Sequence, residues 1–362
     1  MGMTGGRPLR LLVGTYSEPI LFGTGERFCG KGRGIYLCTF DGADIRIEAL
    51  LPLSNPSFLT VDEDTGTIYA VNELKEFHGA YGGGVSEISL SGNGEMRLIG
   101  AYCTKGTDPC HIAVSPDKTR LGIANFADGS VSFFRLDGAG HITGELQHIR
   151  HQGSGPHPVR QKGPHAHSVI FDGAGHALVP DLGMDRLVCY DVQGADAQPD
   201  AAHSVQLSPG SGPRFGEFSP DHRHFYLINE LASSVTHFAC HQGNMQECET
   251  VSTLPEDFVG ENICSDLHIA PDGRTLYASN RGHDSLAVYR VGADGGLTLL
   301  QWVSCHGRTP RNFAVTPDGR SLLAGNQDSD TIAVFDVAED GCLAFRRNVD
   351  FPTPVCIRFL RG

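Results

Sequence analysis

The segment HIAVSPDKTRLGIAN (111–125) sets the pattern of the chain. It joins two apolar runs through a Pro-Asp turn and ends in Asn, nine residues after the proline. The same spacing recurs in FGEFSPDHRHFYLIN (215–229), LHIAPDGRTLYASN (267–280) and FAVTPDGRSLLAGN (313–326), and more weakly in FLTVDEDTGTIYAVN (58–72) and VIFDGAGHALVPD (169–181). The turn has a physical basis, because Pro presets φ, Asp caps the turn, and Gly accepts a positive φ.

Each copy is followed by a third apolar run, such as IAVFDV (332–337). The final residues of successive copies are 46 to 56 residues apart. A period of about 50 residues made of short strands and tight turns is typical of a β-propeller blade. No long segment keeps the 3.6-residue period of a helix, so the chain is predicted to be all-β.

The two ends of the chain supply one more blade. TPVCIRF (353–359) has the pattern of an inner strand with no partners after it, whereas LRLLVGTYS (9–17), GIYLCTF (34–40) and IRIEALLPL (45–53) resemble second, third and fourth strands. Pairing the N-terminal strands with the C-terminal strand would close the ring and remove its free sheet edges. We therefore predict a seven-bladed β-propeller that forms a single domain over residues 1–362.

Composition excludes several kinds of partner. The chain holds 28 Lys and Arg against 42 Asp and Glu, a net charge of −14, which argues against nucleic-acid or anionic-membrane binding. No apolar run approaches the roughly 18 residues of a membrane helix, and the N-terminal segment is a poor match to a signal peptide. The 11 cysteines are scattered without a CxxC motif, which favours buried thiols in a reducing cytoplasm.

Two arginines lie at equivalent positions near the start of two inner strands. Arg214 lies in GPRFGEF (212–218), and Arg311 lies in TPRNF (309–313). Because corresponding loops of all blades meet at one mouth of the channel, both guanidinium groups should face one space. They would suit an anionic ligand, although rim salt bridges are an alternative interpretation.

A pair of histidines precedes another inner strand. His165 and His167 lie in GPHAH (163–167) and would share a face if the segment were extended. Either imidazole could act as a general base or donate a hydrogen bond to a substrate oxygen near neutral pH. The alternative is a simple turn followed by one exposed histidine.

The residue directly after the repeated Asn changes from acidic to basic to neutral polar between blades. This position holds Glu73, Glu230, Arg281 and Gln327 in four blades, and His283 is close to one of them. We expect these side chains to line the same mouth, although Glu73 and His283 could instead belong to a charge network. The Asn itself is expected to be structural, binding loop backbone at the strand end.

The longest irregular stretch, 141–164, joins two blades; part of it is expected to form a fourth strand, and the rest a loop that contains His and Pro. Long loops of this kind often line a site, and its histidines lack the spacing of a metal centre. The chain has no strand-to-helix GxGxxG motif and no GxSxG nucleophile elbow. We expect a site with no cofactor and no metal.

The motifs CHIAVSPD, GPHAH, INELASSV, SNRGHDS, TPRNFAVTPDG and NQDSDTIAVF together resemble the seven-bladed β-propeller lactonase family. This family includes 6-phosphogluconolactonases and carboxy-cis,cis-muconate lactonizing enzymes. The resemblance covers nearly the whole chain. It implies catalytic roles for one histidine of GPHAH, for Arg214 and Arg281, and for Glu230.

The resemblance implies a hydrolase that opens an anionic sugar-acid lactone, with 6-phospho-D-glucono-1,5-lactone the favoured substrate. Arginines would hold the anion and polarise the carbonyl, and a histidine would take a proton from water, since the arginines beside Glu230 should keep that carboxylate ionised and weakly basic. The alternatives are a lactonase for a non-phosphorylated aldonate or aldarate lactone, a muconate-type cycloisomerase, a divalent-metal lactonase, and a non-enzymatic binding scaffold.

Overall fold

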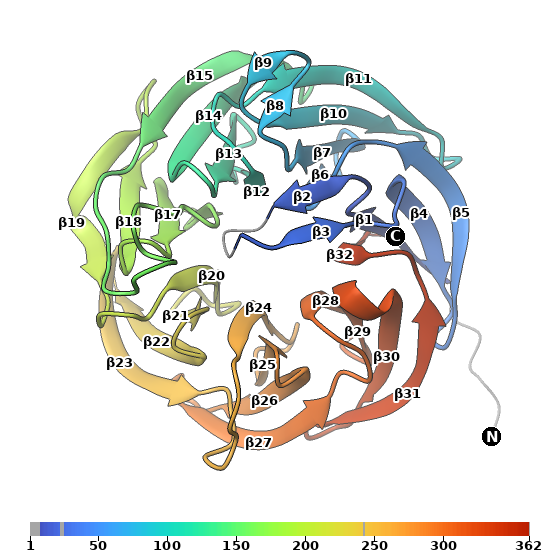
Figure 1. The fold of residues 1–362 in the computed structure, drawn as a ribbon, viewed down its shortest axis with the longest axis vertical. Coiled ribbons are helices and arrows are strands. Elements are labelled where there is room, and N and C mark those ends of the chain that lie inside the picture. Colours follow the sequence, from blue (N-terminus) through green and yellow to red (C-terminus); the bar gives the residue numbers. More distant parts are fainter. Residues whose placement is uncertain (1–7, 22–24, 242, 362) are drawn as a thin grey trace.

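The strands form a ring of sheets around a central channel (Figure 1). The computed structural model describes residues 8–21, 25–241 and 243–361. Across these residues the chain forms seven four-stranded antiparallel sheets, which confirms the predicted seven-bladed β-propeller. The first strands of most neighbouring blades contact one another around the channel. No described segment forms a helix with the length and hydropathy that crossing a membrane requires.

The blades follow one another along the chain, and the strands of each blade succeed one another from the channel outward. Blade one contains β6 (Leu59–Asp62), β7 (Thr67–Asn72), β10 (Gly84–Leu90) and β11 (Met96–Cys103). Blade two contains β12 (Pro109–Val114), β13 (Arg120–Asn125), β14 (Ser130–Leu136) and β15 (Ile142–Arg150). Blade three contains β16 (Ile170–Phe171), β17 (His176–Asp181), β18 (Arg186–Asp191) and β19 (Gln198–Gln206). Blade four contains β20 (Pro213–Phe218), β21 (His224–Asn229), β22 (Ser234–His241) and β23 (Asn244–Ser252).

Three further sheets complete the ring. Blade five contains β24 (Ile263–Ile269), β25 (Thr275–Arg281), β26 (Ser285–Val291) and β27 (Leu297–Ser304). Blade six contains β28 (Pro310–Val315), β29 (Ser321–Asn326), β30 (Thr331–Val337) and β31 (Leu343–Asp350), with the short helix η1 (Gln327–Ser329) after β29. The closing blade contains β32 (Pro354–Phe359), β1 (Leu9–Thr15), β4 (Gly34–Phe40) and β5 (Ile45–Pro52).

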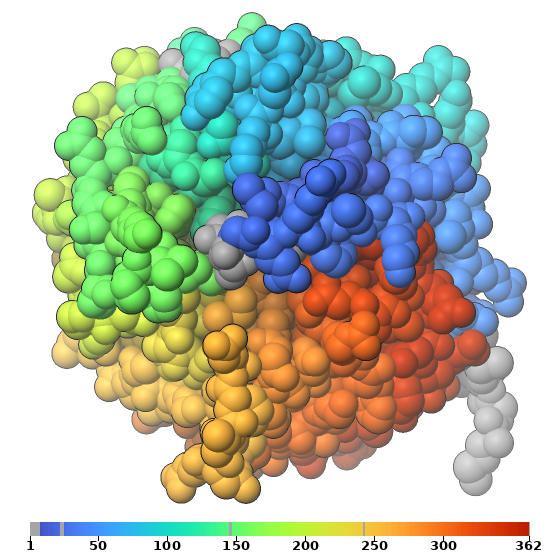
Figure 2. Space-filling view, viewed as in Figure 1, coloured from blue at the N-terminus to red at the C-terminus, as the bar shows by residue number. Residues whose placement is uncertain are grey.

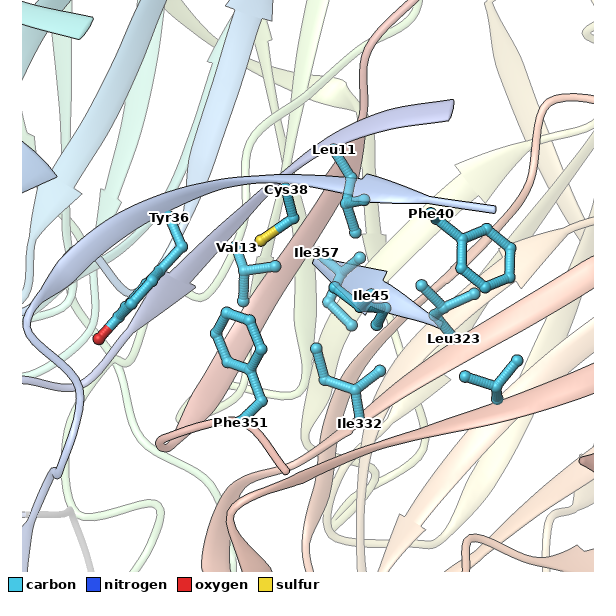
Figure 3. Packing of buried hydrophobic residues seen from close by; sticks show 11 residues of the cluster. Leu11, Val13, Tyr36, Cys38, Phe40, Ile45, Leu323, Ile332, Phe351 and Ile357 are labelled. Atoms are coloured by element: carbon cyan, nitrogen blue, oxygen red, sulfur yellow. The ribbon is translucent and has the colours of Figure 1, made fainter. Parts of the chain in front are cut away.

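The closing blade joins the two ends of the chain as the sequence predicts. Strand β1 pairs antiparallel with β32, with Leu11 opposite Phe359 and Val13 opposite Ile357. Side chains of this blade pack against Leu323 of blade six in a buried apolar cluster (Figure 3). Burial of this apolar area stabilises the closed ring, and the pairing of β1 with β32 joins the two ends of the chain in one sheet.

The Pro-Asp turns fold as expected, with one difference. In blade two, Oδ1 of Asp117 accepts hydrogen bonds from the Ser115 hydroxyl at 2.6 Å and from the Thr119 amide at 3.2 Å. The residue after the aspartate has a positive φ, and in two copies it is glycine, as predicted. In the other two copies Lys118 and His222 adopt this conformation, so the turn does not strictly require glycine.

Inner strands carry a β-bulge near their first residues. In blade four, Pro213 pairs with Asn229 and Phe215 pairs with Ile228, so Arg214 has no partner across the strand pair. A bulge re-aims the side chain of its extra residue. Residues at the same register shift are Cys110, Arg214, Arg311 and Val355, and His167 directly follows the equivalent bridge between Ala166 and Asp181.

Two hairpins lie outside the blades and do not follow from the sequence pattern. Strands β2 (Pro19–Leu21) and β3 (Arg27–Cys29) form one hairpin, which lies across the face shown in Figure 1 and covers part of the channel mouth in Figure 2. Strands β8 (Glu76–Phe77) and β9 (Ala80–Tyr81) form the other. The repeat could not reveal them, because each occurs once.

Candidate active site

One cavity of about 760 Å³ gathers most of the side chains that the sequence singled out. A narrower space of about 20 Å³ in the channel shares His167 and Arg311 with this cavity and is also lined by Arg214. Residues more than 250 positions apart in the chain therefore meet at one end of the propeller. The predicted residues that line the larger cavity are Glu73, His167, Glu230, Arg281, Arg311 and Gln327.

Two structural positions supply these side chains. The first is the bulge of the inner strand, which aims Arg214 and Arg311 into the channel. The second is the position that follows the repeated Asn at the end of the second strand. At that position a hydrogen bond to the neighbouring loop fixes the backbone. In blade four, for example, the Glu230 amide donates to the Gly212 carbonyl at 2.7 Å. The repeated Asn is buried and structural, and in blade four Nδ2 of Asn229 donates to the Ser234 hydroxyl at 3.0 Å.

Glu230 is the centre of the main charged cluster. Its Oε1 lies 2.5 Å from Nη2 of Arg160, and its Oε2 lies 2.8 Å from Nη2 of Arg281 and 2.9 Å from Nε of Arg214. Glu230 is only 2% exposed. Three guanidinium groups from three different segments thus converge on one buried carboxylate, and each is held there by charge.

The electrostatics of this cluster keep Glu230 ionised. Burial alone would raise its pKa, but Arg160, Arg281 and Arg214 outweigh burial and hold the pKa well below its usual range. Burial lowers the pKa of Arg281, even though Glu230 opposes that effect. A strongly stabilised carboxylate is a poor proton acceptor, so Glu230 is better suited to fixing the arginines than to general-base catalysis.

His167 lies beside this cluster and is buried. Its Nε2 is 3.9 Å from Oε2 of Glu230, and its Nδ1 is 3.6 Å from Sγ of Cys110. Burial, reinforced by the positive charge of Arg214, holds the pKa of His167 well below its ordinary value. The imidazole is therefore neutral near pH 7 and has a nitrogen lone pair that can accept a proton.

A second cluster lies on another part of the lining. Glu73 accepts a hydrogen bond from the Tyr16 hydroxyl at 2.8 Å, and its Oε1 is 4.0 Å from Nη2 of Arg311. The Arg311 guanidinium also stacks over the Tyr16 ring, 5.1 Å from its centroid, and contacts Oε1 of Gln327 at 3.4 Å. Burial raises the pKa of Glu73, although Arg311 opposes this shift.

Two predicted residues lie outside the cavity lining. Nδ1 of His165 is 2.8 Å from the carbonyl oxygen of Phe126, and its ring stacks on the Phe126 ring. His283 lies 2.6 Å from the Ser285 hydroxyl through Nδ1 and contacts the ring of Phe258. The segment is not regular strand at this point, and both imidazoles contact the ring of Phe126, but only His167 lines the cavity. The positions of His165 and His283 do not support direct contact with a ligand in the cavity.

Sequence reasoning missed three residues of the site. Arg160 comes from the long loop after β15. The sequence indicated that this loop could line a site, but it did not indicate which of its residues would do so. Cys110 occupies the same bulge as Arg214, and its signal was the matching Pro-x entry in DPCH, GPRF and TPRN. Tyr16 follows the second strand of the closing blade, where the other blades place Glu73 or Glu230.

The two clusters define what the cavity can bind and do. Together they hold four guanidinium groups against two carboxylates, so these clusters suit an anionic ligand, while Glu26, Asp108, Glu261 and Asp328 line other parts of the same cavity. Fixed guanidinium groups also stabilise an oxyanion that develops on a carbonyl oxygen, and a neutral imidazole beside them can take a proton from water. This combination suits the hydrolysis of an ester.

Known proteins with similar sequences align with most of the chain. A 6-phosphogluconolactonase of Bacillus subtilis is 30% identical, with 96% of this chain and 97% of that protein aligned. A 6-phosphogluconolactonase of Formosa agariphila is 31% identical over 78% of this chain and 82% of its own length. The solved structure of a periplasmic gluconolactonase from Pseudomonas aeruginosa is 32% identical, with a TM-score of 0.89 and coverage of 98% and 99%.

The family assignment agrees with the fold and with the motifs. The model of the family described as Lactonase, 7-bladed beta-propeller matches residues 10–359. That match begins in strand β1 and ends with strand β32, so it includes all seven blades and every residue of the two charged clusters. The chain belongs to the seven-bladed β-propeller lactonase family.

Proposed function

We propose that this protein hydrolyses the ring ester of a sugar-acid lactone, and that its substrate is 6-phospho-D-glucono-1,5-lactone, which opens to 6-phosphogluconate. The observation that carries the proposal is the buried Glu230 carboxylate, surrounded by three arginines and adjacent to the neutral imidazole of His167. The names of the relatives from Bacillus subtilis and Formosa agariphila support the phosphorylated lactone.

The arginines would bind the substrate and stabilise the charge that develops in the reaction. Arg281 and Arg214 are fixed by Glu230 and by backbone carbonyls, since Nη2 of Arg281 donates to Cys264 at 2.8 Å and Nη1 of Arg214 donates to Ser265. Guanidinium groups that are fixed before the substrate arrives need no reorganisation when the carbonyl oxygen becomes an oxyanion. Arg160 and Arg311, which both line the larger cavity, would hold the anionic substituent.

His167 would accept the proton from the attacking water. Water adds to the lactone carbonyl carbon, the proton passes to the imidazole, and the tetrahedral intermediate then expels the ring oxygen, which takes a proton back from the imidazolium. An anionic substrate opposes the positive charge of Arg214 and Arg311, which depress the pKa of His167. Substrate binding would therefore raise this pKa and make the imidazole a better base when it is needed.

The test is the initial rate of ring opening by the purified protein, measured against the spontaneous rate. The proposal predicts rapid opening of 6-phospho-D-glucono-1,5-lactone and a higher kcat/KM than for D-glucono-1,5-lactone. Ring opening at the spontaneous rate for both lactones would overturn it. Equal or faster turnover of the lactone without phosphate would instead favour the second candidate.

That second candidate is a lactonase for a non-phosphorylated sugar acid. It is favoured by one observation, the 32% identity to the structure described as a periplasmic gluconolactonase. A cycloisomerase that forms a lactone from an unsaturated diacid would use the same groups in reverse. Incubation with a carboxymuconate and with both sugar lactones separates the three activities in a single set of assays.

We also propose a cytoplasmic location, which matches the supply of a phosphorylated sugar lactone. All 11 cysteines are free thiols, including the exposed Cys29 and Cys248, and this favours a reducing compartment. Fractionation of the cells that produce the protein, with activity measured in each fraction, tests the location. Recovery of the activity outside the cytoplasm would contradict it.

A further inference from the structure

Two histidine–aspartate pairs lie next to each other in blade three. Nδ1 of His176 is 2.7 Å from Oδ2 of Asp172, and Nδ1 of His203 is 2.6 Å from Oδ2 of Asp200. The two imidazole rings face each other across strand β18, with centroids 5.1 Å apart. Both pairs are only partly exposed, with side-chain exposure between 12% and 28%.

The local backbone explains why these side chains meet. Cys189 pairs with Asp200 and Leu187 pairs with Val205, so residues 201–204 bulge out of strand β19. Oδ1 of Asp200 accepts the amides of Ala202 and His203, which turns His203 back over the sheet. Just before β17, Asp172 likewise accepts the amide of His176 at 2.9 Å. Each aspartate therefore fixes both the backbone and the imidazole of its histidine.

We propose that His176, His203 and Asp200 bind one divalent transition-metal ion of the Zn²⁺ type. One ligand atom from each of the three lies within 4.8 Å of the other two, and no other such group occurs within the described residues. Two imidazole nitrogens and a carboxylate oxygen suit Zn²⁺, whereas Ca²⁺ and Mg²⁺ prefer oxygen ligands alone. Because Nδ1 of His203 and Oδ2 of Asp200 lie 2.6 Å apart, the ion would replace the hydrogen bond between them, and water would complete the coordination.

Asp172 would act as a positioning residue for this site. Histidines that bind metals usually donate their other ring N–H to a carboxylate, which fixes the tautomer and the ring orientation. Asp172 accepts that hydrogen bond from Nδ1 of His176, so Nε2 is the nitrogen left to bind the ion. This arrangement distinguishes the group from two surface histidines that merely lie close together.

The neighbouring blade covers the proposed site. Gly243, in the turn between β22 and β23, lies against both rings, and a Cβ there would be in ordinary van der Waals contact, 3.6 Å from Cε1 of His176 and 3.7 Å from Nε2 of His203. Its φ of 81° is a conformation that other residues rarely adopt. A bound ion would thus connect β17 to β19 under a turn of blade four, away from the reaction, since none of its three ligands lines the catalytic cavity. Its expected role is to stabilise this edge of the ring.

The experiment measures Zn²⁺ binding by the full chain after chelator treatment and dialysis. We expect calorimetric titration with ZnCl₂ to show one tight site that MgCl₂ does not fill, and the Tm to rise with Zn²⁺ and fall again with EDTA. His176→Gln and His203→Gln should each abolish the site. Asp172→Asn should weaken it by about 10- to 100-fold without removing a ligand, so the site stays testable if a Gln variant folds poorly.

The matched control is His141→Gln. His141 also pairs with a carboxylate, with Nδ1 2.6 Å from Oε1 of Glu87, but it belongs to no three-ligand group within the described residues. This variant should bind Zn²⁺ like the wild type, and all variants should keep lactone turnover. The proposal is wrong if the wild type shows no tight Zn²⁺ site, or if the stoichiometry, affinity and Tm response are the same in His203→Gln and Asp172→Asn as in His141→Gln.

Discussion

Nη2 of Arg160 and Oε1 of Glu230 lie 2.5 Å apart, although 70 residues separate them in the chain. Arg160 belongs to the loop after β15, whereas Arg214 and Arg281 belong to strands. The loop therefore adds one guanidinium to a cluster that the blades already build. Because Arg160 lines the cavity and Glu230 also contacts Arg214 and Arg281, we expect this arginine to contribute more to binding than to the chemical step.

Arg160→Ala is expected to raise KM for the phosphorylated lactone by about 10- to 100-fold, the effect of losing one charged hydrogen bond, with a smaller change in kcat. Arg160→Lys should restore part of the loss, since it keeps the charge without the planar fork. Steady-state kinetics on both sugar lactones provides the measurement. An equal loss for the uncharged lactone would show that Arg160 acts by shaping the loop and not by binding the phosphate.

His167→Ala should lower kcat by about 10²- to 10⁴-fold, because positioned proton transfer contributes a factor of this size. His165→Ala is the matched comparison, since it removes a neighbouring imidazole that contacts Phe126 and does not line the cavity. It should keep most of the activity. Single-turnover rates of the two variants compare the chemical step directly. The assignment fails if the two substitutions have equal effects, or if His165→Ala has the larger one.

The pH profile follows from the direction of the His167 pKa. The free group titrates at 6.5, and burial and the arginines lower its pKa well below that value, so the neutral base persists under mildly acidic conditions. We expect kcat/KM to be flat from about pH 8 to 6.5 and to decline only at lower pH. The phosphate of the proposed substrate titrates at about pH 6, so the profile should be repeated with D-glucono-1,5-lactone. A decline centred at or above about pH 6.5 with both lactones would contradict this expectation.

Closure of the ring should make a large contribution to stability. Ile357 is buried in β32 opposite Val13 of β1, and Ile357→Ala should lower the free energy of unfolding by about 2–5 kcal/mol. Ile47→Ala, on the exposed side of β5, should change it by less than about 0.5 kcal/mol. Denaturant titrations of both variants test the difference. Similar midpoints would mean that the closing strand does not hold the ring together.

The repeat made the architecture predictable, because every blade uses the same strand spacing. The constant nine-residue spacing predicted the second strands. The strands without partners at the two ends of the chain predicted the closing blade, and the pairing of β1 with β32 confirms it. The β2–β3 and β8–β9 hairpins could not be predicted in this way, since neither belongs to the repeat.

The site was predictable only where it follows the repeat. Glu230, Arg281 and Gln327 occupy one repeated position, and Arg214 and Arg311 occupy another, so the blade pattern alone predicted that they would meet. The choice between the two histidines of GPHAH required the bulge geometry, which periodicity does not encode. Arg160 lies on a loop whose path depends on tertiary contacts such as the one between Gln161 and Asp185 at 2.7 Å.

The most direct test of the central claim compares wild type, Arg281→Ala and Arg290→Ala in the opening of 6-phospho-D-glucono-1,5-lactone. Arg281 binds Glu230 in the cavity, whereas Arg290 is an exposed arginine one strand away. We predict that wild type and Arg290→Ala open the lactone far faster than water alone, and that Arg281→Ala loses about 10²- to 10³-fold in kcat. Equal rates for all three proteins would contradict a catalytic role for the arginine–glutamate cluster.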